Sequence, residues 1–143
     1  MEAITFNKQY RNYSEINTVS DRLRWCRHHL GLTQQEVADA IGISRNSYTD
    51  FECGQLSHYP QDSLNKLAVL YHISVYDLLD DYNRFLYEGQ EKQLKAYCTS
   101  LDLNKKEFAQ FLHIDASLLH AWETGQKQIS FHSWEKHFKN FRN

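Results

Sequence analysis

The 143-residue chain contains few residues that interrupt regular structure, with only five Gly and one Pro. This scarcity argues against a loop-rich sandwich or a low-complexity chain and favours helices joined by short connections. Hydrophobic residues make up 41% of the sequence and aromatic residues 14%, which is enough for a packed core in a chain of this length. We therefore predict an all-α, folded protein.

Paired cysteines and long apolar runs are also missing. The three cysteines, Cys26, Cys53 and Cys98, have no paired spacing, which is typical of a reducing compartment rather than of a disulfide framework. No apolar run approaches the roughly 20 residues that span a bilayer, and the N-terminal residues lack the features of a signal peptide. We expect a soluble, cytoplasmic protein that does not enter a membrane.

Positive charge is not in excess, because the net charge is −2. Nucleic-acid-binding domains are often more basic, with a pI above about 9. The charge is nevertheless uneven: residues 73–88 contain one basic and four acidic residues, whereas residues 89–143 contain eight basic and six acidic residues. An acidic connector thus precedes a basic C-terminal third.

Hydrophobic periodicity and capping residues predict five helices between residues 18 and 89. Thr33 with Glu36 forms a capping-box pattern, Gly31, Gly42 and Gly54 are expected to end helices, and Pro60 opens one. The first predicted helix has an inward face of Leu23, Cys26, Arg27 and Leu30. A fifth helix is expected from Ser74 to Gly89, with an apolar stripe of Val75, Leu78, Leu79, Tyr82, Phe85 and Leu86.

The chain also contains an internal repeat at a spacing of 71 residues. Leu23, Leu30, Leu32, Glu36, Ala38, Ile43, Glu52, Gly54 and Gln55 match Leu94, Leu101, Leu103, Glu107, Ala109, Ile114, Glu123, Gly125 and Gln126. We interpret this as a duplicated unit of about 60 residues. The predicted organisation is an N-terminal arm (1–17), a first unit (18–80), a connector (81–89) and a second, divergent unit (90–143).

The first unit resembles the helix-turn-helix family of phage repressors and Cro, the XRE class of regulators. The resemblance rests on Arg24, Arg27, residues 31–38, residues 41–44, Tyr48, Phe51, Glu52, Gly54, Pro60, Leu64, Leu67 and Ala68. It implies tandem lambda-repressor-like bundles, joined here by an acidic amphipathic helix. It also implies a sequence-specific, double-stranded DNA-binding transcriptional regulator, a repressor, that reads the major groove with the third helix of its first unit.

Side-chain chemistry assigns expected roles to residues of the first unit. Arg pairs with guanine, Asn with adenine and Asp with cytosine in the major groove, so the predicted base-reading residues are Arg45, Asn46, Thr49 and Asp50. Residues at helix N-termini and in the following loop are predicted to contact phosphate: Thr33, Gln34, Gln35, Ser44, Gln55 and Ser57. By the resemblance, Arg27 and Glu52 form a structural ion pair. Solvated helix surface is the other interpretation of Asn46 and Thr49.

The second unit departs from this pattern. Cys98 replaces Arg27, so the ion pair to Glu123 must be lost or replaced, and His113 stands where the motif has Gly42. Its predicted outward face, Ala116, Ser117, His120 and Ala121, has few base readers, and Leu118 is expected to be exposed. The possible DNA contacts are Lys105, Lys106, Ser117, His120, Gln126 and Lys127. The unit either adds sequence-independent DNA affinity or packs on a partner chain.

Other chemistry is not expected. Cys26, His28 and His29 point to different helix faces, so we predict no metal site. No phosphate loop, nucleophile elbow or other catalytic pattern occurs, so we expect neither an enzyme nor a cofactor. A homodimer through Tyr82, Phe85 and Leu86 or through the second unit is possible. The rival function is a protein-interaction module, an antitoxin or phage-type inhibitor, that uses the same scaffold to bind another protein.

Overall fold

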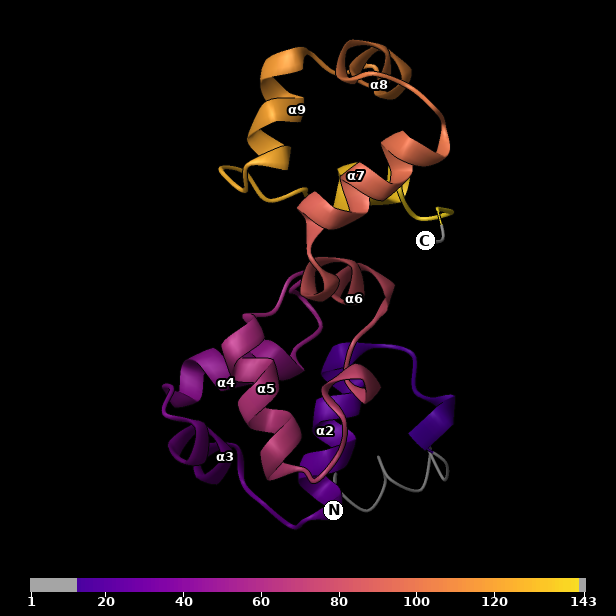
Figure 1. Cartoon of the computed structure of the whole chain (residues 1–143). Helices are drawn as coiled ribbons and strands as arrows, with labels where there is room; N and C mark the ends of the chain where they lie inside the picture. Colours follow the sequence, from indigo (N-terminus) through magenta and orange to yellow (C-terminus); the bar gives the residue numbers. More distant parts are fainter. Residues whose placement is uncertain (1–12, 142–143) are drawn as a thin grey trace. The chain divides into compact units, whose positions relative to one another are not determined.

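The computed structural model describes residues 13–141, and all regular structure in that range is helical (Figure 1). The prediction of an all-α fold is therefore confirmed. No helix in this range is long and apolar enough to cross a bilayer. The α-helices are α2 (Val19–His29), α3 (Gln34–Ile41), α4 (Arg45–Glu52), α5 (Gln61–Leu70), α6 (Asp81–Glu88), α7 (Gln90–Ser100), α8 (Lys105–Leu112), α9 (Ala116–Glu123) and α10 (Phe131–His137).

The chain forms two compact units, Met1–Asp80 and Asp81–Asn143. The first unit packs α2, α3, α4 and α5 around one core. Its innermost side chains come from all four helices and are almost completely buried: Leu23, Val37, Tyr48, Leu64 and Leu67. Since each helix buries one face and leaves the other to solvent, the unit is a helical bundle with polar outer surfaces.

Residues 13–17 of the predicted N-terminal arm pack on this bundle. Tyr13–Glu15 form a 3-10 helix, and Ile16 is buried. Arg22 of α2 donates hydrogen bonds to the carbonyl oxygens of Ile16 (3.0 Å) and Leu79 (2.7 Å). Through these bonds, the Arg22 side chain links the segment before α2 to the segment at the end of the first unit. Residues 1–12 of the predicted arm lie outside the described residues.

The prediction of one helix from Ser74 to Gly89 is wrong. Val75–Asp77 form a 3-10 helix, and regular helix begins again only at α6. Leu78 and Leu79 are buried at the end of the first unit, whereas Tyr82, Phe85 and Leu86 are buried in the second unit. A continuous helix would place all these side chains on one face, and one face cannot pack into two separate cores. The helix is therefore interrupted between Asp77 and Asp81.

Helix α6 belongs to the second unit rather than to a separate connector. Tyr82 donates a hydrogen bond to the Ile129 carbonyl oxygen (2.7 Å) and contacts Trp134, and Phe85 contacts Phe138. Tyr82, Phe85 and Leu86 are therefore core residues, and the predicted homodimer surface formed by these three side chains is wrong. Their side chains are at most 8% exposed and pack within the unit.

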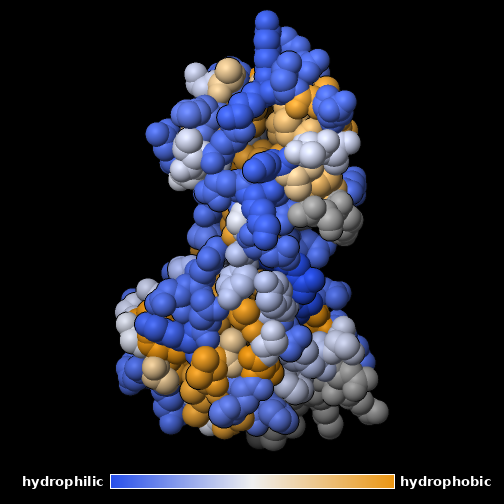
Figure 2. All heavy atoms as spheres, viewed as in Figure 1, coloured by the Kyte–Doolittle hydropathy of each residue, from blue (hydrophilic) through white to orange (hydrophobic). Residues whose placement is uncertain are grey.

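The visible surface is mostly hydrophilic, with some apolar residues exposed (Figure 2). Leu30, which was predicted to face inward with Leu23 and Cys26, is 42% exposed because α2 ends at His29 and the chain turns there. The other large apolar side chains that are exposed in residues 13–141 are Leu56, Val69, Tyr76, Phe111 and Phe131.

Candidate nucleic-acid interface

Helix α3 begins with a capping box and ends in a tight turn that leads into α4. The Thr33 hydroxyl accepts a hydrogen bond from the Glu36 amide (3.1 Å), and the Glu36 carboxylate accepts one from the Thr33 amide (2.9 Å), which completes a capping box. Gly42 ends α3 with φ 78°, a conformation that favours glycine. Ala38 is completely buried between the helices. Its small side chain lets α3 and α4 approach closely, so the turn fixes their relative orientation.

Helix α4 presents its polar face outward. Tyr48 and Phe51 are buried and hold the helix on the bundle. Three of the predicted base-reading residues, Arg45, Asn46 and Asp50, are exposed on the opposite side, whereas Thr49 is half-buried at its edge. Ser44 caps the helix by accepting a hydrogen bond from the Ser47 amide (3.1 Å). The sequence therefore folds into a helix whose free face carries the donors and acceptors that base edges require.

The N-terminus of α3 opens onto a hollow of about 660 Å³, lined by residues 31–35 together with Arg27, His28 and Arg45. The first N–H groups of a helix have no intrahelical acceptor and carry partial positive charge. With the Arg45 guanidinium at its edge, this hollow is suited to an anion such as a phosphate. Of the predicted phosphate contacts, Thr33 and Gln35 are exposed here and Gln34 is half-buried.

The two glutamine side chains at this helix start are already engaged. Gln35 donates a hydrogen bond to Asp39 (2.8 Å), and Gln34 donates one to Glu52 (3.2 Å). The backbone amides of these residues, rather than their side chains, are thus the donors that this end of α3 offers to an anion. Gln55 and Ser57 lie exposed in the loop that follows α4, beyond Gly54.

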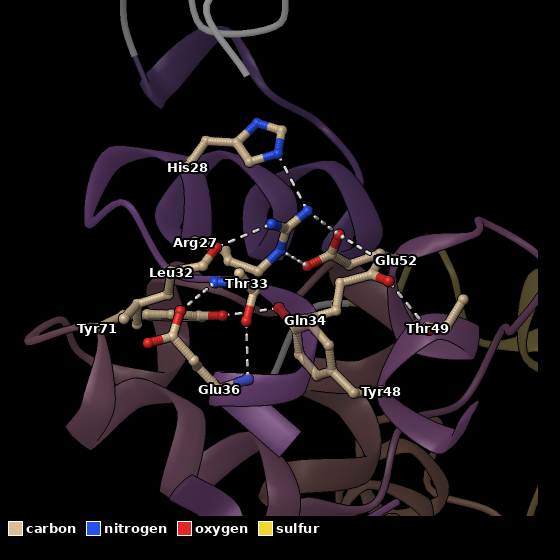
Figure 3. Close-up of polar contacts among 10 residues, drawn as sticks. All are labelled: Arg27, His28, Leu32, Thr33, Gln34, Glu36, Tyr48, Thr49, Glu52 and Tyr71. Atoms are coloured by element: carbon tan, nitrogen blue, oxygen red, sulfur yellow. Dashed lines mark hydrogen bonds and ion pairs between the residues drawn. The ribbon is translucent and has the colours of Figure 1, made fainter. Parts of the chain in front are cut away.

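Arg27 and Glu52 form a nearly buried ion pair beneath this surface (Figure 3). The Arg27 guanidinium donates to both Glu52 carboxylate oxygens (2.7 and 2.9 Å) and to the Leu32 carbonyl oxygen (3.0 Å). Their side chains are only 12% and 4% exposed. Because the pair joins α2 to the end of α4, it holds the outward-facing helix on the bundle.

Burial affects two ionisable groups of this cluster. Burial tends to lower the pKa of Arg27, but the hydrogen bond and the charge of Glu52 outweigh it, so the pKa is raised. Burial strongly raises the pKa of Tyr48, whose hydroxyl lies 2.7 Å from that of Tyr71. Both shifts favour the protonated forms that make these contacts between α2, α4 and α5.

The second unit repeats the geometry of the turn with different residues. Asn104 and Glu107 form a capping box (2.8 and 3.0 Å) at the start of α8, and His113 takes the place of Gly42 with φ 57°. The ion pair is replaced rather than lost, because Lys105 lies 3.8 Å from Glu123. The side chains of Lys105 and Glu123 are 77% and 26% exposed, so this pair is far more solvated than its counterpart.

The outward surface of α8 and α9 combines exposed polar residues with an apolar hollow. The predicted DNA contacts Lys105, Lys106, Ser117, His120, Gln126 and Lys127 are all exposed. Between α8 and α9, however, lies a hollow of about 430 Å³ whose floor includes Ala109, Ile114 and Leu119. Two expectations for this surface are wrong: Ala121 is buried, and Leu118 is half-buried against the core rather than exposed.

Sequence reasoning missed Gln90, a buried residue at the start of α7. Its amide donates to the carbonyl oxygens of Trp122 (3.0 Å) and Lys127 (2.7 Å) and accepts from the Ile129 amide (2.8 Å). Gln90 thereby fixes the loop that carries Gln126 and Lys127. One signal was available, since position 90 matches the buried Val19 in the repeat.

A group of His, Cys, Asp or Glu residues that could hold a metal ion does not occur in the part of the chain that the structure describes. Cys26 is buried, and the ring of His29 stacks on that of Trp25 with 4.8 Å between the ring centroids.

Two kinds of comparison with known proteins, with a family model and with curated relatives, give consistent results. Residues 19–79 match a family model described as a helix-turn-helix domain. The chain is 25% identical over 115 residues to the HTH-type transcriptional regulator SinR of Bacillus subtilis, covering 77% of this chain and 98% of that protein. It is 31% identical over 101 residues to the cryptic phage CTXphi transcriptional repressor RstR of Vibrio cholerae, covering 70% of this chain and 87% of that protein.

A third match concerns an enzyme. The chain is 30% identical over 69 residues to a glutamine–fructose-6-phosphate aminotransferase of Methanocaldococcus jannaschii. The match covers 48% of this chain but only 6% of that protein, so it gives no argument for aminotransferase activity. No solved structure matches the chain significantly.

Proposed function

The chain belongs to the phage-repressor and Cro-like (XRE-class) family of helix-turn-helix transcriptional regulators, and on this premise we propose that it represses transcription by binding double-stranded DNA sequence-specifically. The observation that carries the proposal is the rigid presentation of α4. Its polar face is exposed while its apolar face, the capped turn and the Arg27–Glu52 ion pair fix it on the bundle. A helix held in this way fits the major groove.

We assign base reading to α4 and phosphate binding to its surroundings. Arg45 suits guanine, Asn46 suits adenine and Asp50 suits the amino group of cytosine. The backbone amides at the start of α3 and the exposed Gln55 and Ser57 suit flanking phosphates. Since a phosphate in the hollow at the start of α3 would also lie beside Arg45, this residue links the two kinds of contact.

Selection of bound duplexes from a random DNA pool tests the proposal. An enriched sequence supports it, and an unenriched pool contradicts it. On the enriched site, Arg45→Ala should weaken binding by about 10- to 100-fold, the discrimination expected of one bidentate contact. Lys66→Ala is the matched control, because Lys66 is also exposed but pairs with Asp62 on α5 and does not line the hollow at the start of α3.

We propose that the second unit adds sequence-independent DNA affinity through Lys105, Lys106 and Lys127. These exposed lysines lie at the start of α8 and in the loop after α9, the places that correspond to the phosphate contacts of the first unit. Replacing Lys105 and Lys106 by Ala should reduce the slope of log affinity against log salt by about one for each lost contact. Lys139→Ala, near the C-terminus, should leave the slope unchanged.

The apolar hollow between α8 and α9 favours a second candidate function, protein binding by this unit. Lys105 and Lys106 also line this hollow, but Ala109, Ile114 and Leu119 offer a surface that suits an apolar side chain of a partner. In that case the chain would act as an antitoxin or phage-type inhibitor, or the second unit would form a homodimer. Co-purification of a stoichiometric partner without DNA affinity at low salt supports the inhibitor. A dimeric mass together with a palindromic selected site supports the homodimer.

A further inference from the structure

Thr49, at the edge of the outward face of α4, is tied to α3 by a chain of hydrogen bonds (Figure 3). Its hydroxyl lies 3.1 Å from Oε1 of Gln34, and Nε2 of Gln34 lies 3.2 Å from Oε1 of Glu52. The Glu52 carboxylate in turn accepts two hydrogen bonds from Arg27. Three helices thus contribute to one polar network that ends at the surface.

The chemistry of this network fixes the direction of every bond. A carboxylate that is paired with a guanidinium can only accept hydrogen bonds, so the Gln34 atom that faces Glu52 must be the amino group. The Gln34 carbonyl oxygen therefore faces Thr49, and it too can only accept. Consequently, the Thr49 hydroxyl donates its single proton to Gln34.

A threonine hydroxyl has one proton and two lone pairs. With the proton directed to Gln34, Thr49 offers only lone pairs to a base edge. In the major groove, adenine N6 and cytosine N4 donate hydrogen bonds, whereas guanine O6 and thymine O4 accept them. Guanine O6 or thymine O4 would face the lone pairs of the Thr49 hydroxyl, and two acceptors cannot form a hydrogen bond.

We infer that Thr49 is a specificity-determining residue that selects an amino base, adenine or cytosine, over a keto base at the position it contacts. The Arg27–Glu52–Gln34 network sets this preference from inside the protein. The inference rests on the proposed function, because it requires α4 to lie in the major groove.

The experiment is selection from a random DNA pool with the full chain and three variants, each first shown by circular dichroism and thermal melting to be folded. Thr49→Val removes the hydroxyl but keeps the shape, Thr49→Ser keeps the hydroxyl, and Gln34→Leu removes the acceptor. The wild-type chain and Thr49→Ser should prefer A or C at one position by about two- to tenfold, the net effect of one hydrogen bond. Thr49→Val should lose that preference.

Gln34→Leu separates the network from a direct contact of Gln34 with DNA. Without its acceptor, the Thr49 hydroxyl is free to rotate and to donate as well as accept, so amino and keto bases should become equally acceptable at that one position. Loss of a phosphate contact by Gln34 would instead weaken all sequences uniformly.

Four outcomes overturn the inference. These are an unchanged selected sequence in Thr49→Val, a keto base at the Thr49-dependent position, loss of the preference in Thr49→Ser, and a preference in Gln34→Leu that is as strong as in wild type. Failure of the wild-type chain to enrich any sequence would instead contradict the proposed function itself, so the two failures are distinguishable.

Discussion

Removal of the Arg27 side chain should destabilise the first unit strongly. In the variant Arg27→Met, Glu52 loses two charged hydrogen bonds of 2.7 and 2.9 Å, and the Leu32 carbonyl oxygen loses its partner at 3.0 Å. The Glu52 side chain is only 4% exposed, so water cannot replace the lost donors freely. Loss of one partner from a buried ion pair costs about 3–5 kcal/mol. We expect about 3 kcal/mol, because Arg27 keeps 12% exposure.

Urea unfolding combined with amide hydrogen exchange measures this effect in the full chain. Exchange resolved by peptide separates the opening of α2–α4 from that of α7–α9, so the loss should be confined to the first unit. The matched control is Lys105→Ala, which removes the partner of Glu123. Because that pair is solvated and its atoms lie 3.8 Å apart, we expect a loss below about 1 kcal/mol in the second unit.

A double variant gives the sharper test of the reasoning. If the cost comes from an uncompensated buried charge, adding Glu52→Leu to Arg27→Met should recover much of the lost stability. A loss below about 1 kcal/mol in Arg27→Met, or a double variant less stable than the single one, would refute the view that the pair acts through buried charge.

Three further predictions concern the turns, the buried thiol and Gln90. Gly42→Ala should destabilise the first unit and His113→Gly should stabilise the second, each by about 1 kcal/mol in thermal unfolding, because both positions have positive φ. An added Cβ at Gly42 meets no atom within 4 Å, so the cost there comes from backbone conformation and not from a steric clash. Burial raises the pKa of Cys26 from 9.0 to about 12, so its contribution to stability is complete below pH 9 and is lost as pH rises towards 12, measured by urea midpoints. Gln90→Leu should cost the second unit about 2 kcal/mol in urea unfolding, since three backbone groups each lose a hydrogen bond and two of these bonds are buried.

Each of these has a control and a contrary result. If the melting temperatures of Gly42→Ala and His113→Gly equal that of the wild-type chain, the residue type at these two turns does not affect stability through backbone strain. For the thiol, Cys26→Ala should flatten the stability profile between pH 9 and 12 relative to wild type, and an equally steep profile would contradict the assignment. For Gln90, the exposed neighbour Lys92→Leu should change stability little, and equal losses in both variants would show that the three hydrogen bonds contribute nothing specific.

Local patterns predicted the frame of both units well. The capping box at Thr33, and the turn positions at Gly42 and His113, depend on residues within a few positions of each other. The hydrogen bonds and the positive φ that these residues adopt are short-range properties, so the sequence is sufficient to predict them.

Longer-range choices were less predictable. The stripe from Val75 to Leu86 has the period of one helix, yet Leu78 and Tyr82 belong to different cores. Periodicity reports which residues are apolar but not which core receives them. For the same reason Leu118 was expected to be exposed, although it packs against the second core.

The sequence by itself predicted an all-α fold, the capped turns and a 71-residue internal repeat, because composition, caps and repeat spacing act locally or as a pattern. Only the tertiary structure decided which hydrogen-bond partners its polar side chains have. It showed that Gln34 bonds to Glu52 and Thr49, and that Gln90 holds the loop before Ile129. Such bonds join side chains and backbone from separate elements, and their direction follows from which donors and acceptors packing brings together.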